Sequence, residues 1–193
     1  MDTSNKELFM DFAYSNIHRY GITKFLNWLE NETDFFFSPA STKYHGAYEG
    51  GLVEHSLYVY YMFIKLAPAF NYDLSNPTLA ESATITTLFH DVCKINSYEK
   101  SFRNVKNKDG AWEQVPCYIY SNNASKFGAH GAYSVFLINQ FMSLSEAETI
   151  AIYHHMGLWD SGKYDDTGKA YENCKLAWLV HVSDEAATYI AGV

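Results

Sequence analysis

The chain has few cysteines, no long apolar run and no leader-like beginning, and each absence excludes a class of protein. Its three cysteines form neither a paired framework nor a Cys-x-x-Cys motif, so we expect free thiols in a reducing compartment. No stretch approaches the about 18 apolar residues that a membrane span requires. The first residues also lack the basic and apolar segments of a signal peptide. We therefore expect a cytoplasmic protein with no membrane partner.

Positive charge is scarce as well, since the formal net charge is −8 at pH 7. An extended nucleic-acid track is not expected, because a phosphate backbone needs many Lys and Arg residues to neutralise it. A small anionic substrate stays open, because bound cations reverse the local field. The sequence contains no Gly-x-x-x-x-Gly-Lys-Ser/Thr, Gly-x-Gly-x-x-Gly, Gly-x-Ser-x-Gly or His-Glu-x-x-His motif.

What the chain does have is enough apolar material for a core and a surplus of aromatic residues. Hydrophobic residues make up 48% of the 193 residues, a length that fits one domain. Sixteen tyrosines and thirteen phenylalanines predict an aromatic core and an aromatic-lined pocket. The same surplus is compatible with a homo-oligomer.

The pattern along the chain predicts an all-α bundle with one small β-hairpin. We expect helices over residues 5–30 with a break near Gly21, over 52–67 and 77–91, from about 130, from about 145, and from about 174. Two signals are specific: Asn76-Pro77 is typical of a helix start, and Ser145 with Glu148 forms a capping box.

Three other segments are predicted to be non-helical. Residues 98–121 carry β-branched and aromatic residues around Asp109-Gly110, which predicts a β-hairpin insertion. Residues 31–51 are rich in turn formers, and we expect their Phe35-Phe36-Phe37 run to pack against the core. Residues 157–173 are predicted to form a loop.

The most informative feature is the adjacent pair His90-Asp91 in LFHDVCKI. It offers one imidazole and one carboxylate, and the carboxylate can bridge two cations. Further candidate ligands stand before and after it, within or beside apolar helical segments: His55, His130, His155 and Asp184. Burying unpaired carboxylates there would cost several kcal/mol, and metal coordination is the simplest compensation. Two metals close together can clamp the attacking and leaving oxygens of a phosphoryl displacement.

This ligand order resembles that of the HD-domain superfamily of metal-dependent phosphohydrolases. SPASTKYHGAYEGGLVEHSL is similar to the first-ligand region of HD exoribonucleases and HD relaxases. HDVCK resembles the HD-x-x-K form of the motif, and HVSDEAATYI resembles the last helix. The resemblance implies a single HD domain over residues 1–193, with its core at about 40–190 and the hairpin at 98–121 as an insertion.

The resemblance also implies divalent cations, normally two, bridged by Asp91. The other ligands divide between two centres, with His55, His90 and Asp184 at the first and His130 and His155 at the second. Alternatively, His130 and His155 contact substrate phosphate while one metal binds. Imidazole and carboxylate ligands without thiolate favour Mn or Fe, with Zn, Co, Ni or Mg as further candidates.

The choice between neighbouring His154 and His155 is set by the resemblance, which favours His155. Adjacent helical residues point about 100° apart, so both rarely face one site. His18 and His181 are interpreted as structural.

Two further residues are candidates for the chemistry. Lys94 matches the lysine of HD-x-x-K and would hold a phosphate oxygen, or else it is a surface lysine that closes a helix C-terminus. His45 would contact substrate or act as a general acid, or else it is a loop histidine bonded to backbone. Lys126 is a weaker phosphate candidate, and Trp159 with Asp160 would line a base-binding pocket or simply pack.

The expected function is metal-dependent hydrolysis of a phosphate ester or phosphodiester, by a metal-activated water, on a small phosphorylated substrate such as a nucleotide or short oligonucleotide. Three alternatives stay open at this point. They are a nuclease on longer RNA or DNA, a di-iron HD oxygenase, and a non-catalytic binding protein that keeps the metal for stability.

Overall fold

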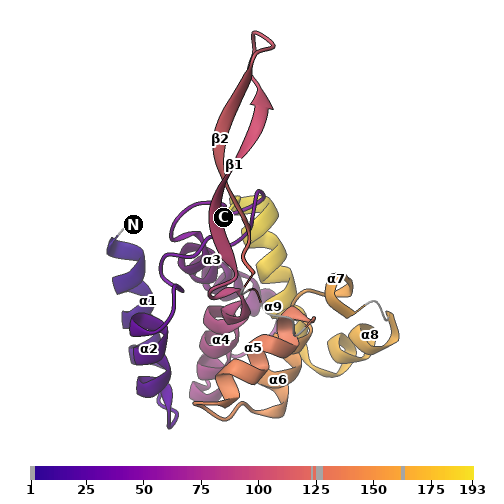
Figure 1. The fold of residues 1–193 in the computed structure, drawn as a ribbon. Coiled ribbons are helices and arrows are strands. Elements are labelled where there is room, and N and C mark those ends of the chain that lie inside the picture. The colour runs from indigo at the N-terminus through magenta and orange to yellow at the C-terminus, as the bar shows by residue number, and fades with distance from the viewer. Residues whose placement is uncertain (1–2, 123, 125–127, 162–163) are drawn as a thin grey trace.

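The computed structural model describes residues 3–122, 124, 128–161 and 164–193. These residues are mostly helical, with a two-stranded antiparallel sheet. The helices are α1 (Thr3–Asn16), α2 (Ile22–Asn31), α3 (Gly51–Leu66), α4 (Pro77–Phe89), α5 (His130–Asn139), α6 (Glu146–Tyr153), α7 (Leu158–Ser161), α8 (Tyr164–Asn173) and α9 (Lys175–Ala186). Strands β1 (Tyr98–Lys106) and β2 (Trp112–Tyr120) form a hairpin that rises from the helical body (Figure 1). Within this described part, no helix is long and apolar enough to cross a membrane.

Aromatic rings from α1, α4 and the loop after α2 form the centre of the larger hydrophobic core. The ring of Phe9 lies 5.1 Å from that of Phe35, 5.5 Å from Phe36 and 5.8 Å from Phe89. All four side chains are buried. The expected packing of the phenylalanine run is therefore confirmed for Phe35 and Phe36, whereas Phe37 is 48% exposed.

A second buried cluster holds α9 against its neighbours. Leu179 and Val180 of α9 lie in one cluster with Phe63 of α3 and Ala151 of α6. Helix α9 also contacts α4. The helices α3, α4, α6 and α9 therefore form one packed group, and the packing fixes how their ends lie relative to one another.

The predicted helix starts of α4 and α6 are confirmed. The side chain of Asn76 accepts hydrogen bonds from two backbone N–H groups of the first turn of α4, and Pro77 is the first helical residue. Ser145 and Glu148 form the capping box at the start of α6, with each side chain accepting from the other's backbone N–H. Because both helices start at fixed positions, the residues at their C-terminal ends are also fixed.

The expectation of a loop over residues 157–173 was wrong, because α7 and α8 occupy most of it. Thr167 and Ala170 of α8 are buried, and α8 packs on α9. The Tyr171 hydroxyl donates to the His154 carbonyl oxygen at 2.9 Å. Glycine and charged residues lowered the local helix signal, but packing on α9 overrides this propensity.

The predicted hairpin is confirmed, and its register is regular from end to end. Tyr98 pairs with Tyr120 at the base and Lys106 pairs with Trp112 near the tip. In the turn, the side chain of Asn107 accepts from two backbone N–H groups.

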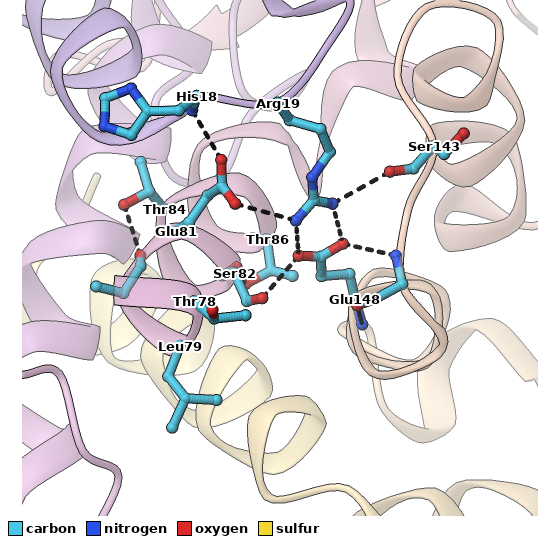
Figure 2. A network of polar contacts seen from close by, with 12 residues as sticks. His18, Arg19, Thr78, Leu79, Glu81, Ser82, Thr84, Thr86, Ser143 and Glu148 are labelled. Atoms are coloured by element: carbon cyan, nitrogen blue, oxygen red, sulfur yellow. Dashed lines mark hydrogen bonds and ion pairs between the residues drawn. The ribbon is translucent and has the colours of Figure 1, made fainter. Parts of the chain in front are cut away.

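A partly buried ion pair joins the turn between α1 and α2 to α4 and α6 (Figure 2). Arg19 donates to both carboxylate oxygens of Glu148, at 2.5 and 2.9 Å, and also reaches Glu81 at 3.3 Å. Ser82 of α4 donates to the same Glu148 carboxylate at 2.7 Å. The Glu148 side chain is fully buried, so its charge depends on these donors.

Burial alone would raise the pKa of Glu148, but hydrogen bonds from Arg19 and Ser82 outweigh it and lower the pKa. A carboxyl whose folded-state pKa is depressed contributes stability above its unfolded-state pKa of about 4.3. That stability is lost as the pH falls through the lower folded-state pKa.

We expect Arg19→Met to lower the free energy of unfolding by about 3–5 kcal/mol at neutral pH, because it leaves Glu148 buried and unpaired. Near pH 4 the loss should shrink, since a protonated Glu148 carries no buried charge. Urea unfolding at the two pH values measures both effects. Lys100→Met is the matched control, because it removes an exposed pair with Glu49 and should cost about 1 kcal/mol or less. Equal losses in the two variants would contradict this account.

Gly131 allows α5 to approach the end of α6. A Cβ atom at Gly131 would lie 2.3 Å from the carbonyl oxygen of Tyr153 and 2.5 Å from that of Ile152. Gly131→Ala should therefore destabilise the fold by about 1–3 kcal/mol, as overpacking does.

Gly168 of α8 is the control, because a Cβ there would have no heavy atom within 4 Å. Gly168→Ala should raise the free energy of unfolding by up to about 1 kcal/mol through helix propensity. Thermal denaturation of both variants measures the difference, and the same sign for both would be inconsistent with the proposed role of Gly131.

Candidate metal centre

Five of the predicted ligands meet at the ends of four helices. All five are buried, with exposed fractions of 8% or less: His55 of α3, His90 and Asp91 at the end of α4, His155 just after α6, and Asp184 of α9. These residues are spread over 130 positions of the sequence, and the packing of α3, α4, α6 and α9 brings them together.

The three histidines of this cluster share one arrangement. In each ring, Nδ1 hydrogen-bonds a backbone carbonyl oxygen: His55 to Val193 at 3.0 Å, His90 to Thr87 at 2.8 Å and His155 to Ile152 at 2.6 Å. Only a protonated nitrogen can donate to a carbonyl, so Nδ1 carries the hydrogen in every case. In the neutral ring, Nε2 then presents its lone pair. Carbonyl-anchored rings of this kind are typical of histidines that bind metals.

The three Nε2 atoms converge on the two carboxylates. His55 Nε2 lies 3.1 Å from Asp184 Oδ1 and 3.3 Å from His90 Nε2. His90 Nε2 lies 3.4 Å from Asp91 Oδ2, and His155 Nε2 lies 3.4 Å from Asp91 Oδ1. Lone pairs of neutral rings would face one another and the carboxylate oxygens here, so the arrangement requires positive charge, either as a proton on an Nε2 atom or as a bound cation.

Buried atoms without hydrogen-bond partners also mark this place. Of the six such side-chain atoms among the described residues, five belong to the site: Asp91 Oδ1, His155 Nε2, His130 Nδ1 and both ring nitrogens of His45. Buried polar atoms are nearly always paired, so a cluster of orphans calls for an explanation. A bound cation would satisfy those of Asp91 and His155.

The cluster therefore could hold a metal ion. Two sets of ligand atoms lie within 4.8 Å of one another, His55 with His90 and Asp91, and His90 with His155 and Asp184. The donors are imidazole nitrogens and carboxylate oxygens, which suit transition metals such as Mn, Fe, Co, Ni and Zn.

Lys94 is not the surface lysine that one interpretation expected. It lies in the turn after Asp91, is 7% exposed, and its Nζ is 2.5 Å from Asp91 Oδ2. Burial would lower the pKa of Lys94, but the negative charge of Asp91 outweighs it and raises the pKa. Lys94 is therefore a buried cation at the centre.

Both carboxylates stay ionised although they are buried. Burial would raise the pKa of Asp91, but the positive charge of Lys94 outweighs it and holds the pKa well below its usual range. Burial likewise works against the ionised Asp184, but the hydrogen bond and charge of His55, when that ring is protonated, outweigh it, so the pKa of Asp184 is also lowered. Ionised carboxylates are the form that binds metals.

His130 lies apart from the five-residue cluster. One of its ligand atoms lies within 4.8 Å of Asp91 and Cys93 ligand atoms, in a third group. The structure thus places His130 near Asp91 but groups His155 with His90 and Asp184. How the ligands divide between two metals stays a prediction. Cys93 was not expected here, and its position two residues after Asp91 was the only sequence signal.

The structure distinguishes His155 from His154. His155 is fully buried and faces Asp91, whereas His154 is partly exposed and its ring packs against Tyr153. The backbone of this segment is held from α9, where His181 Nδ1 donates to the His155 carbonyl oxygen at 2.7 Å. This contact gives His181 the structural role that was expected of it.

His45 reaches the site from the loop before α3. Its ring lies 4.9 Å from that of His55, and its carbonyl oxygen accepts from Ser41 Oγ at 2.7 Å. Close approach of this loop to α3 needs Gly51, where a Cβ would lie 2.0 Å from the Gly46 carbonyl oxygen. Burial, together with the nearby charges of His55 and Lys94, lowers the pKa of His45 to about 4. A ring that is neutral at pH 7 favours the substrate-contact interpretation over the general acid.

A pocket of about 480 Å³ opens onto this centre. Its charged lining includes Asp91, Lys94 and Asp184, and its histidines are His45 and His130. Aromatic side chains form much of the remaining wall, namely Tyr44, Tyr98, Tyr120, Trp159 and Tyr189. The volume lies in the range of small-molecule sites. The predicted aromatic-lined pocket is therefore present, and Trp159 belongs to it, whereas Lys126 and the Asp160 side chain lie outside what the structure describes.

Comparisons with protein-family models, with curated proteins and with solved structures find no match for this chain. The interpretation of the site therefore rests on its own geometry and chemistry. The ligand order in the sequence and the orphaned buried atoms in the fold are the two observations that support it.

We expect His155→Gln to weaken Mn²⁺ binding by at least about 100-fold, because it removes an anchored ligand. His154→Gln is the matched control and should leave affinity unchanged. Calorimetric titration of the metal-free protein measures both, and the Mn²⁺-induced rise in melting temperature should be lost only in His155→Gln. Equal binding in the two variants would remove His155 from the site. Substitution of Asp91 is a poorer test, because it would leave Lys94 buried and unpaired.

Proposed function

We propose that this protein is an HD-type metal-dependent phosphohydrolase or phosphodiesterase that acts on a nucleotide or short oligonucleotide. One observation carries the proposal. Three carbonyl-anchored imidazoles and two ionised carboxylates converge at one side of an aromatic-walled pocket. The order of these ligands in the sequence is that of the HD superfamily, and the helical bundle with one hairpin is compatible with a single HD domain.

A divalent cation held by these ligands would supply Lewis acidity and a water of lowered pKa for attack on phosphorus. The chain's own residues then have defined tasks. Asp91 and Asp184 stay ionised and supply the negative ligands. The carbonyl partners of the three rings keep the Nε2 atoms aimed at the centre without reorganisation.

Lys94 and His45 are the proposed contacts for the phosphate. The Nζ atom of Lys94 pairs with Asp91, and Lys94 also lines the pocket, so a phosphate oxygen bound there would lie close to a buried positive charge. Such a charge stabilises negative charge that develops in the transition state. Both ring nitrogens of His45 lack a partner, which leaves its N–H free to donate to substrate.

The pocket wall supports a substrate with a planar base. The rings of Tyr98 and Tyr120 pack against each other at 5.3 Å with a tilt of 33°, and Trp159, which also lines the pocket, is 80% exposed. Exposed aromatic faces offer stacking worth about 1–3 kcal/mol per base. We propose that His130, which also lines the pocket, either binds a second cation with Asp91 or contacts the phosphate.

The first test is product analysis of a nucleotide panel that includes monophosphates, triphosphates, cyclic nucleotides and short oligomers. With Mn²⁺ or anaerobic ferrous iron, we expect turnover that chelation abolishes. His155→Gln should lower kcat/KM by at least about 1000-fold, because it disrupts the metal centre, whereas His154→Gln should retain wild-type turnover.

The controls separate this proposal from its rivals. Metal binding without turnover on any substrate class would contradict the hydrolase and support a metal-stabilised binding protein. Oxygen uptake with stoichiometric iron and no phosphate release would support an HD oxygenase instead.

A further inference from the structure

The two faces of the β-hairpin carry different chemistry. Directly paired residues of an antiparallel ladder, and residues two apart along a strand, point to the same side. The register therefore places five cross-strand pairs on one side, which we call the aromatic-lysine face: Tyr98–Tyr120, Lys100–Tyr118, Phe102–Pro116, Asn104–Gln114 and Lys106–Trp112. Within these two fully described strands, this face contains no acidic residue.

The opposite face holds both acidic residues of the strands. It pairs Glu99 with Ile119 and Val105 with Glu113, and Arg103 faces Val115. Its apolar residues are mainly aliphatic. The tyrosines, Phe102 and Trp112 are thus gathered on the face from which carboxylates are absent, together with two of the three basic residues of the strands.

Much of the aromatic-lysine face is open to solvent, although Tyr98 and Tyr118 are partly buried. Phe102 is 67% exposed and Trp112 is 68% exposed, because the hairpin rises away from the helical body (Figure 1). Exposed aromatic side chains of this size, repeated along one face, indicate an interaction surface. The ammonium of Lys106 lies 5.3 Å from the ring centroid of Trp112, so charge and aromatic surface alternate closely.

At its base, this face is continuous with the metal-site pocket. Tyr98 and Tyr120 are the first pair of the face, and both line the pocket beside Lys94 and Asp91. From this pair to the Lys106–Trp112 pair, the strand covers eight residue steps, or about 26 Å at about 3.3 Å per residue. That length accommodates on the order of four nucleotides, which is the lower end of site sizes for single-strand binding.

We propose that the aromatic-lysine face binds single-stranded nucleic acid and leads one end of the strand into the metal-site pocket. Bases would stack on Phe102, Trp112 and Tyr118, and Lys100 and Lys106 would contact phosphates. The inference rests on the proposed function for the chemistry at the pocket, and it names the substrate class as short single strands. Aromatic side chains can stack on bases and lysines can contact phosphates, so their alternation fits a ligand that carries both. An apolar protein surface would not require the lysines, and a free phosphate would not require the aromatic side chains.

The acidic net charge of the chain is compatible with nucleic-acid binding at this surface, because the acidic residues of the strands lie on the opposite face of the hairpin. Lys100 pairs with Glu49, but the contact is solvent-exposed, with side-chain exposures of 74% and 44%. An exposed pair of this kind exchanges readily for a phosphate. Because only two lysines contact phosphates, we expect binding of the strand to depend weakly on salt. Each phosphate contact should add about 0.7 to the magnitude of the slope of log affinity against log salt concentration.

The test is fluorescence anisotropy of the full chain with labelled decamers of thymidine and of uridine, in the presence of chelator so that no cleavage occurs. Phe102→Ala with Trp112→Ala should weaken binding of at least one decamer by tenfold or more, since each stacked base is lost. Lys100→Gln with Lys106→Gln should reduce the salt slope by about 1.4.

Matched controls lie on the opposite face of the same strands. Val105→Ala with Val115→Ala, and Arg103→Gln, should leave decamer affinity within about twofold of wild type. Melting temperature is measured for every variant, so that loss of the hairpin is recognised. Comparing the two decamers decides between DNA and RNA as the source of the strand.

Turnover of a small synthetic phosphodiester with Mn²⁺ is measured separately. Diester turnover without decamer binding by wild type would overturn the inference and leave the proposed function intact. Decamer binding that depends on the aromatic-lysine face, without any turnover, would support the face and contradict the hydrolase. Equal losses from both faces, or a hairpin-mediated dimer that excludes the decamer, would also overturn the inference.

Discussion

Burial of the negative charge of Asp91 is the constraint on which the centre of the molecule depends. The carboxylate is 2% exposed, and such a charge is costly unless it is paired. Lys94 compensates one oxygen, and the other, Oδ1, has no hydrogen-bond partner. His90 and His155 stand on either side of this carboxylate with their Nε2 atoms toward it. The side chains around Asp91 are therefore arranged to place positive charge next to its carboxylate, and this requires that the ends of the helices that carry them lie close together.

Backbone geometry makes this arrangement rigid. Each ligand ring is anchored to a carbonyl oxygen, and for His90 and His155 that carbonyl lies three residues earlier, in the last turn of their own helix. The Ile152 carbonyl oxygen, which anchors His155, also lies close to Gly131, since a Cβ atom there would be 2.5 Å from it. The same carbonyl therefore takes part in the packing of α5 on α6 and in orienting His155. A larger side chain at Gly131 would disturb both the stability of the fold and the candidate site.

The pocket and the hairpin extend this centre outward. Buried charge lies at the candidate metal site, aromatic residues line the pocket beside it, and the aromatic-lysine face continues from Tyr98 and Tyr120. A molecule with a net charge of −8 can still present such a surface, because the acidic residues of the hairpin lie on its other side. Period-two alternation along the strands is sufficient to separate the two kinds of side chain.

Much of this could be predicted from the sequence, because the signals are local. Asn76-Pro77 and the Ser145–Glu148 box specify helix starts through their own backbone contacts, and Asp109-Gly110 specifies a turn. The candidate ligands followed from residue type and order. The sequence did not reveal helix α8, because its burial depends on α9. Nor did it reveal the Lys94–Asp91 pair, the approach of Cys93 or the carbonyl anchors. Sequence determined which groups could bind a cation; packing between distant segments decided which of them meet, because distances across a core depend on every helix that fills it.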